Sequence, residues 1–380
     1  MRSGVGRISV SASAMFTANL VDALRLSTRQ GAEYLFKFCT KILVLLSMLL
    51  GLSACGKEPL YQSQAFVFGT RVDLSVYGAD EAQAQKAMSA VQQELQRLHT
   101  MLHAWQPSEL SALNSAFAQG QSREISAELG AMLQEATALS EQSGGLFNPA
   151  IGGLVKLWGF HADEFAPVQP DPQQIAHWIQ ANPQMRDIVL DPMPDGDFRA
   201  HSRNPAVQLD LGGYAKGYAL DRAAAILRQQ GIQHALINIG GNVLAMGQHG
   251  DRPWRVGIQH PRQAGALATL ALQDGEAIGT SGDYQRYFLR DNVRYCHLID
   301  PRSGYPMQGV EAVTILTHGA RAGVLSDAAS KPLFLAGVAG WQIAAQRMQL
   351  PEALLIDGTG HVHATDAMRK RLTLFSPGTP

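Results

Sequence analysis

The sequence predicts an α+β protein: a single domain in which antiparallel sheets dominate and helices pack against them. The second half of the chain repeats short apolar segments separated by glycine turns, at spacings that suit hairpins better than crossover connections. The first half instead contains long segments with apolar residues at helical spacing. No linker is long or polar enough to divide the 380 residues into independent domains.

Residues 1–54 are expected to be an export region. Lys37 and Lys41 precede an apolar run over 42–54, which is too short to cross a bilayer comfortably but suits a secretory signal. The run ends in LSAC, which resembles a bacterial lipoprotein signal with Cys55 as the lipidated first residue. A plain signal peptide or a short buried helix is the alternative. A lipid anchor at Cys55 predicts a location on the periplasmic side of a bacterial membrane.

After a tether over 55–64, the expected domain occupies residues 65–375. Segment 65–78 alternates apolar and polar residues and predicts a strand with a turn at Gly69. Helical spacing then predicts helices over 81–105, 107–114, 126–145 and about 172–180. The second of these helices has Ser108 as a candidate N-cap, and Gly144 with Gly145 stops the third.

The remaining segments complete the α+β pattern. A hairpin is expected around 193–198 and a helix over 216–231. Short strands are expected within 234–247, 254–260, 268–282, 283–301 and 311–319. In the later segment SDAASKPLF, a helix starting near Ser330 would place Pro332 in its first turn and leave Asp327 in the turn before it.

Composition argues against a nucleic-acid-binding protein and against a disulfide-stabilised one. The formal net charge is only −1, so the chain lacks the basic surface that nucleic-acid binding requires. Of the three cysteines only Cys296 lies in the body of the chain, so no disulfide framework or CxxC pair is present. Cys296 is expected to be a packed thiol and not a nucleophile.

Three glycine turns at strand ends predict a pocket lined by backbone amides. The stretch 209–231 carries Asp210 on a strand, then a glycine doublet, then a helix with Lys216 in its first turn. Such a turn gathers free N–H groups and a positive helix end, which suits phosphate. Similar turns occur within 237–242 and 277–288, the latter with Thr280 and Ser281. Together they indicate a polyanionic ligand such as a nucleotide, although each turn alone could serve backbone geometry only.

His297 is the candidate general base. It stands at the end of a predicted strand, immediately before a turn through Asp300 and Pro301. A histidine there can accept a proton near neutral pH, although a lone histidine is more often structural.

Nine segments in order then resemble the ApbE family of FAD:protein FMN transferases. They are FGT, WQPSELSALN, SGGLFNPAIGGLVKLWGF, DLGGYAKGYALD, NIGGNVLAMG, WRVGI, GTSGDYQRYF, HLIDPRSGYP and SDAASKPLFLAG, and they cover residues 66–340. The resemblance implies cleavage of FAD at its diphosphate, transfer of FMN to a Thr or Ser hydroxyl, and release of AMP. Expected partners are exported flavin-acceptor subunits of membrane electron-transport complexes. An FAD pyrophosphatase and a non-catalytic FAD-binding lipoprotein are the alternatives.

The resemblance also implies roles for individual residues. His297 corresponds to the base, and Leu298 or Ile299 would contact FAD beside it. Phe68 and Trp105 would contact FAD through their rings, ordinary core packing being the alternative for both. The other residues expected to bind FAD are Asn148, Pro149, Ala150, Asp210, Lys216, Thr280 and Ser281.

A Mg²⁺ site is implied as well, but this sequence departs from it. By this resemblance, the family's site is built from a backbone carbonyl of the glycine turn, an Asp and a Thr. These ligands correspond here to Gly213, Asp327 and the position of Lys331. A charged lysine has no lone pair with which to bind a metal. We therefore expect Asp327 to keep a cation, which is either Mg²⁺ or the Lys331 ammonium itself.

Overall fold

The computed structural model of the protein describes residues 34, 36–42, 59–162, 164 and 166–374. The chain divides into two units, 1–57 and 58–380, which we treat separately. In the first unit, residues 34 and 36–42 are helical and exposed, whereas Cys55 and most of the apolar run lie outside the described residues. Within the described part of the chain, every helix is too short or too polar to cross a membrane.

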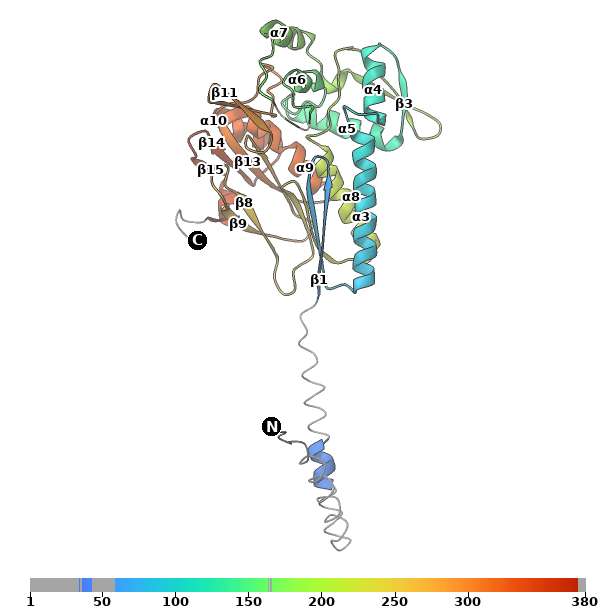
Figure 1. Ribbon diagram of the computed structural model, residues 1–380, viewed down its shortest axis with the longest axis vertical. Coiled ribbons are helices and arrows are strands. Elements are labelled where there is room, and N and C mark those ends of the chain that lie inside the picture. The colour runs from blue at the N-terminus through green and yellow to red at the C-terminus, as the bar shows by residue number, and fades with distance from the viewer. Residues whose placement is uncertain (1–33, 35, 43–58, 163, 165, 375–380) are drawn as a thin grey trace, which may run out of the picture. The chain divides into compact units, whose positions relative to one another are not determined.

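An eight-stranded antiparallel sheet forms the centre of the second unit, in agreement with the predicted fold class (Figure 1). Its order is β1 (Leu60–Val67), β2 (Thr70–Tyr77), β6 (His234–Ile239), β7 (Asn242–Met246), β10 (Ala277–Gly282), β13 (Val310–Thr317), β14 (Ala353–Asp357) and β15 (Val362–Ala364). The expected tether over 55–64 is wrong at its end, because β1 already begins at Leu60. Because Leu60 pairs with Tyr77, the hairpin begins five residues before the start expected at 65.

The sheet separates two hydrophobic cores. Helices α3 (Glu81–Leu102), α8 (Ala215–Gln229), α9 (Ala322–Ala328) and α10 (Ser330–Arg347) contribute to the larger core on one face. The small sheet of β16 (Thr373–Leu374), β9 (Ala266–Leu272) and β8 (Trp254–Gln259) covers the other face. Side chains alternate between the faces, so Ala277 joins the first core and Ile278 the second.

The other elements surround this centre. They are α4 (Glu109–Ala118), β3 (Arg123–Ile125), α5 (Ala127–Gln142), α6 (Gly152–Leu157), α7 (Pro172–Ala181), η1 (Met185–Asp187), β4 (Ile188–Pro192), β5 (Phe198–Ser202), β11 (Tyr287–Arg290), β12 (Val293–Cys296) and α11 (Asp366–Arg371). Ser108 caps α4 as predicted, accepting the N–H of Ser111. Gly144 and Gly145 follow α5 with φ of 68° and 81°, which glycine adopts without steric cost.

The segment over 326–334 agrees with the sequence in one respect and differs in another. Helix α10 begins at Ser330, so Pro332 lies in its first turn, where a missing N–H costs nothing. Asp327, however, lies in the last turn of α9 and not in an open turn. The two helices are separated by Ala329 alone, which keeps helical φ and ψ.

Candidate active site at the start of helix α8

A buried carboxylate between two lysines forms the centre of the candidate site. Asp327 is 1% exposed, and Lys331 Nζ donates to its Oδ1 and to its backbone oxygen, both at 2.7 Å. Lys216 Nζ lies 3.4 Å from the same Oδ1. The backbone N–H of Gly217 donates to Oδ2 at 3.0 Å. We call Lys216, Asp327 and Lys331 the lysine–aspartate cluster.

Electrostatics keep this carboxylate ionised. Burial alone would raise the pKa of Asp327, but Lys216 and Lys331 outweigh burial and hold the pKa below its ordinary value. Burial also lowers the pKa of Lys331, and Asp327 opposes that effect. An ionised Asp327 between two ammonium groups leaves the cluster with a positive charge.

Helices α8 and α9 cap each other, which explains the position of Asp327. Neither helix has a capping side chain of its own. Asp327, near the end of α9, accepts the free N–H of Gly217 in the first turn of α8. Asp221 of α8 in turn accepts the N–H groups of Gly323 and Val324, at 2.8 and 3.0 Å, in the first turn of α9. Burial raises the pKa of Asp221 to about 6.

The glycine turn before α8 lies against the lysine–aspartate cluster. A Cβ on Gly213 would come within 2.9 Å of Lys331 Cε and 3.7 Å of the Phe147 ring, so glycine is required by close approach. Lys216 Nζ also donates to the Gly212 oxygen at 3.3 Å. Asp210 accepts the Gly212 N–H at 2.8 Å and thereby shapes the turn.

The segment 147–150 lies beside that turn. The Asp210 N–H donates to the Pro149 oxygen at 2.8 Å, and the oxygen of the fully buried Ala150 accepts from the Gln208 N–H at 3.1 Å. Asn148 donates to the Pro183 oxygen and accepts from the Ala150 N–H. The Asn148 amide thus orders this loop through protein contacts, and its contact with FAD stays a prediction.

Of the predicted hydroxyl pair, only Ser281 faces the cluster. Ser281 Oγ is 2.7 Å from Ser330 Oγ, and Ser330 Oγ donates to the Asp327 backbone oxygen at 2.9 Å. Thr280 pairs instead with Thr314 at 2.9 Å. Successive residues of a strand point to opposite faces of the sheet, so Thr280 and Ser281 lie on different faces, and contact of Thr280 with FAD stays a prediction.

His297 follows β12 and has a fixed tautomer. Its backbone N–H donates to the Arg286 oxygen at 3.0 Å, and its Nδ1 lies 3.2 Å from the same oxygen. A carbonyl oxygen only accepts, so Nδ1 carries the proton and Nε2 has the lone pair. Burial, Arg286, Lys216 and Lys331 together lower the pKa of His297. The imidazole is therefore neutral, and it lies within the electric field of both lysines.

The remaining predicted residues have contacts of their own. Leu298 and Ile299 are buried, at 6% and 4% exposure, and pack in two different hydrophobic clusters. Trp105 contacts the His161 ring at 5.4 Å. Phe68 contacts the His99 ring at 5.7 Å and has a φ of 57° at the β1–β2 turn. Phe68 and Gly69, with φ of 57° and 66°, are the two central residues of this hairpin turn, where the tight type of turn requires positive φ at both.

The residues present do not fit the implied Mg²⁺ site. Mg²⁺ requires oxygen ligands in octahedral arrangement, whereas the Lys331 side chain lies between Gly213 and Asp327. Its ammonium already neutralises the carboxylate and cannot act as a ligand. Among the described residues, no cluster of three His, Cys, Asp or Glu side chains could hold a metal elsewhere.

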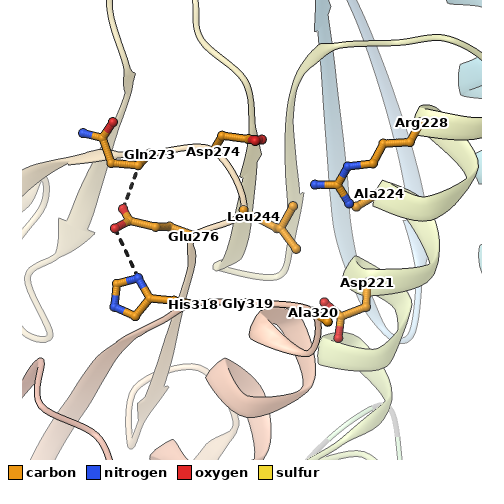
Figure 2. A pocket seen from close by; sticks show the side chains of 11 residues that line it. Asp221, Ala224, Arg228, Leu244, Gln273, Asp274, Glu276, His318, Gly319 and Ala320 are labelled. Atoms are coloured by element: carbon orange, nitrogen blue, oxygen red, sulfur yellow. Dashed lines mark hydrogen bonds and ion pairs between the residues drawn. The ribbon is translucent and has the colours of Figure 1, made fainter.

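A hollow of about 500 Å³ beside the later turns of α8 has different chemistry (Figure 2). Glu276 on its wall accepts the Gln273 N–H at 2.8 Å and lies 3.4 Å from His318 Nδ1. Arg371 pairs with the same carboxylate at 2.7 Å. The hollow includes none of the predicted site residues, and Arg371 neutralises its Glu276 carboxylate.

Sequence reasoning missed one member of the site, the Gly217 N–H that holds Asp327. Ser330, expected at the start of its helix, links the cluster to β10. A signal for Gly217 was present, because a helix that starts without Ser, Thr, Asp or Asn leaves N–H groups for another partner. Cys296, by contrast, is buried as predicted, and burial raises its pKa to about 12.

Fold and site together define an α+β protein with an electropositive, glycine-lined site and a neutral histidine, a combination suited to phosphoester chemistry. The sequence pattern of the ApbE family matches residues 68–355. The chain therefore belongs to the ApbE family.

Three relatives illustrate the extent of the similarity. An FAD:protein FMN transferase of Rhodobacter capsulatus is 42% identical over 83% of this chain and 59% of its own length. This chain thus spans less than two thirds of that relative. An FAD:protein FMN transferase of Klebsiella pneumoniae is 35% identical over 68% of this chain and 78% of its own. The ApbE protein of Thermotoga maritima has a crystal structure that superposes with a TM-score of 0.75 at 28% identity, covering 82% of this chain and 99% of the other.

Proposed function

We propose that this chain is an FAD:protein FMN transferase. The observation that carries the proposal is the pair Lys216 and Lys331, held at Asp327 beside the glycine turn that begins α8, together with His297, whose pKa these lysines lower. Such a site combines a base for a hydroxyl with positive charge for a diphosphate. Family membership and the similarity to named FMN transferases support the same activity.

The proposed reaction uses these groups in one displacement. His297 Nε2 accepts the proton of a Thr or Ser hydroxyl on the acceptor protein. The hydroxyl oxygen forms a bond to the phosphorus of the FMN half of FAD, and the bond from that phosphorus to the bridging oxygen breaks. The bridging oxygen and its electron pair leave with AMP. Lys216 and Lys331 stabilise the negative charge of the diphosphate during this step.

The partners and location are part of the same proposal. Exported flavin-acceptor subunits of membrane electron-transport complexes would supply the hydroxyl. Lipidation of Cys55 would hold the enzyme on the periplasmic side of a bacterial membrane, where such subunits occur. The LSAC motif after an apolar run supports this location.

The test is incubation with FAD and an acceptor subunit, followed by in-gel flavin fluorescence. We expect a fluorescent acceptor with the wild-type chain and a loss of about 10²–10⁴-fold in rate for His297→Ala. His177→Ala is the matched control, because this histidine is exposed on α7. Free FMN without labelled acceptor would assign a pyrophosphatase instead, and unchanged FAD would assign a binding protein.

A further inference from the structure

The Lys331 side chain fills the space that a metal ion would need. Its stem passes Gly213, where an added Cβ would be 3.2 Å from Lys331 Cδ and 2.9 Å from Cε. Its ammonium then makes two hydrogen bonds of 2.7 Å to Asp327. The lysine thus packs against one residue expected to bind Mg²⁺ and pairs with the other.

Burial and rigidity make this arrangement more than a surface ion pair. The Lys331 side chain is only 14% exposed and that of Asp327 only 1%. A buried carboxylate without a partner is strongly disfavoured, so the lysine is held in place by the acid it neutralises. Lys331 is also the second residue of α10, and the ring of the following Pro332 restricts its backbone conformation.

The charge of the cluster suits a diphosphate. Asp327 carries one negative charge and the two ammonium groups carry two positive charges, which leaves a net charge of +1. A divalent cation in place of the Lys331 ammonium would give the same cluster a net charge of +2, so the lysine supplies one unit of positive charge where the metal would supply two. The side chain of Lys216 is 24% exposed, so part of this positive charge is accessible from outside.

We propose that Lys331 replaces the divalent cation in this chain. Held by Asp327 and supported by Lys216, its ammonium provides the positive charge that faces the substrate diphosphate, and transfer of FMN proceeds without Mg²⁺. This inference rests on the proposed function for the reaction, whereas the claim that the site holds no metal stands on the contacts alone.

A direct metal titration tests the claim that the site holds no metal, and it needs no reaction. Chelator-treated, FAD-free protein is titrated with MnCl₂, and free Mn²⁺ is followed by electron paramagnetic resonance. We expect the wild-type chain to leave the free Mn²⁺ signal as it is in buffer. Lys331→Thr, which restores an oxygen ligand beside Asp327, should bind Mn²⁺ and reduce that signal.

Transfer of FMN in EDTA tests the claim that the reaction proceeds without Mg²⁺. Wild-type transfer should stay within twofold of its rate in Mg²⁺, whereas Lys331→Thr should lose about 100-fold in EDTA and recover in Mg²⁺. Lys331→Met keeps the stem against Gly213 without the charge, so it should lose transfer in both conditions. Lys86→Met, on the exposed face of α3, is the control and should change nothing.

The outcomes separate the two proposals. Binding of Mn²⁺ by the wild-type chain, together with loss of transfer in EDTA, would overturn the role of Lys331 and leave the transferase assignment intact. Absence of transfer under all conditions would overturn the proposed function, while the Mn²⁺ titration would still decide whether Lys331 excludes a metal. If Lys331→Thr fails to fold, the wild-type titration and Lys331→Met decide the same question.

Discussion

His297 illustrates how neighbouring charges prepare a single residue for its role. The Arg286 carbonyl fixes the proton on Nδ1, and burial together with three cations disfavours a second proton on the ring. The lysines that would bind the substrate phosphates therefore also keep the base unprotonated. Replacing either lysine would change both functions at once.

The pH dependence of transfer follows from that shift. A base works only when deprotonated, so its rate contribution is lost as pH falls through its pKa in the folded protein. Because the pKa of His297 is lowered, we expect transfer to be flat from pH 8 to well below pH 6.5, the ordinary histidine value. Single-turnover rates across this range measure the effect. A rate that halves near pH 6.5 would contradict it.

Among the elements, the α8–α9 pair determines the geometry of the site. Gly217 and Gly323 let the two helices approach backbone to backbone, since a Cβ on Gly217 would lie 2.3 Å from the Gly323 oxygen. The same approach brings Asp327 to the start of α8 and Asp221 to the start of α9. The packing of α8 on α9 and the capping of both helices therefore depend on the same close approach of Gly217 and Gly323.

Gly217→Ala should disturb that contact. The added methyl group must displace backbone, and overpacking of this kind costs about 1–3 kcal/mol in the free energy of unfolding. Chemical denaturation measures the loss, and transfer should fall with it because Asp327 moves. Gly340→Ala in α10 is the control: its nearest neighbour is the Ala336 Cβ at 3.1 Å, and alanine favours a helix. Equal stability of both variants would contradict the role of the α8–α9 contact.

At the scale of the molecule, the described fold begins at the first hairpin. β1 pairs along its whole length with β2, and β2 pairs with β6 in the centre of the sheet. The larger core contains residues from β2 to β14 and all four helices that carry or support the site. Both cores are formed by described residues of the second unit.

Removal of residues 1–57 should therefore leave the fold intact. We expect a change in Tm of less than about 2 °C, because the sheet and both cores are formed within the second unit. Transfer of FMN to a soluble acceptor should persist. Removal of residues 1–67 is the matched comparison and should lower Tm, since it exposes β2 as an edge. A large loss of Tm on removing only 1–57 would show that the first unit stabilises the second.

Much of this architecture could be predicted because its causes are local. Ser108 caps α4, glycine ends α5, and alternating side chains define the β1–β2 hairpin, so each follows from a few neighbouring residues. The start of β1 was misplaced since its outer residues are exposed and lack a strong apolar pattern. The sequence did not reveal that Ser281 and not Thr280 faces the cluster, because the face of a strand depends on what covers the sheet.

The sequence by itself determined the fold class, the order of the elements, the family and the departure at Lys331 from the expected metal ligand. Tertiary structure decided what that departure means. Only folding brings Gly213, Lys216, Asp327 and Lys331 together from the starts of α8 and α10 and the end of α9. The physical reason is that charge pairing and close approach depend on distance in space, which segments more than a hundred residues apart do not reveal.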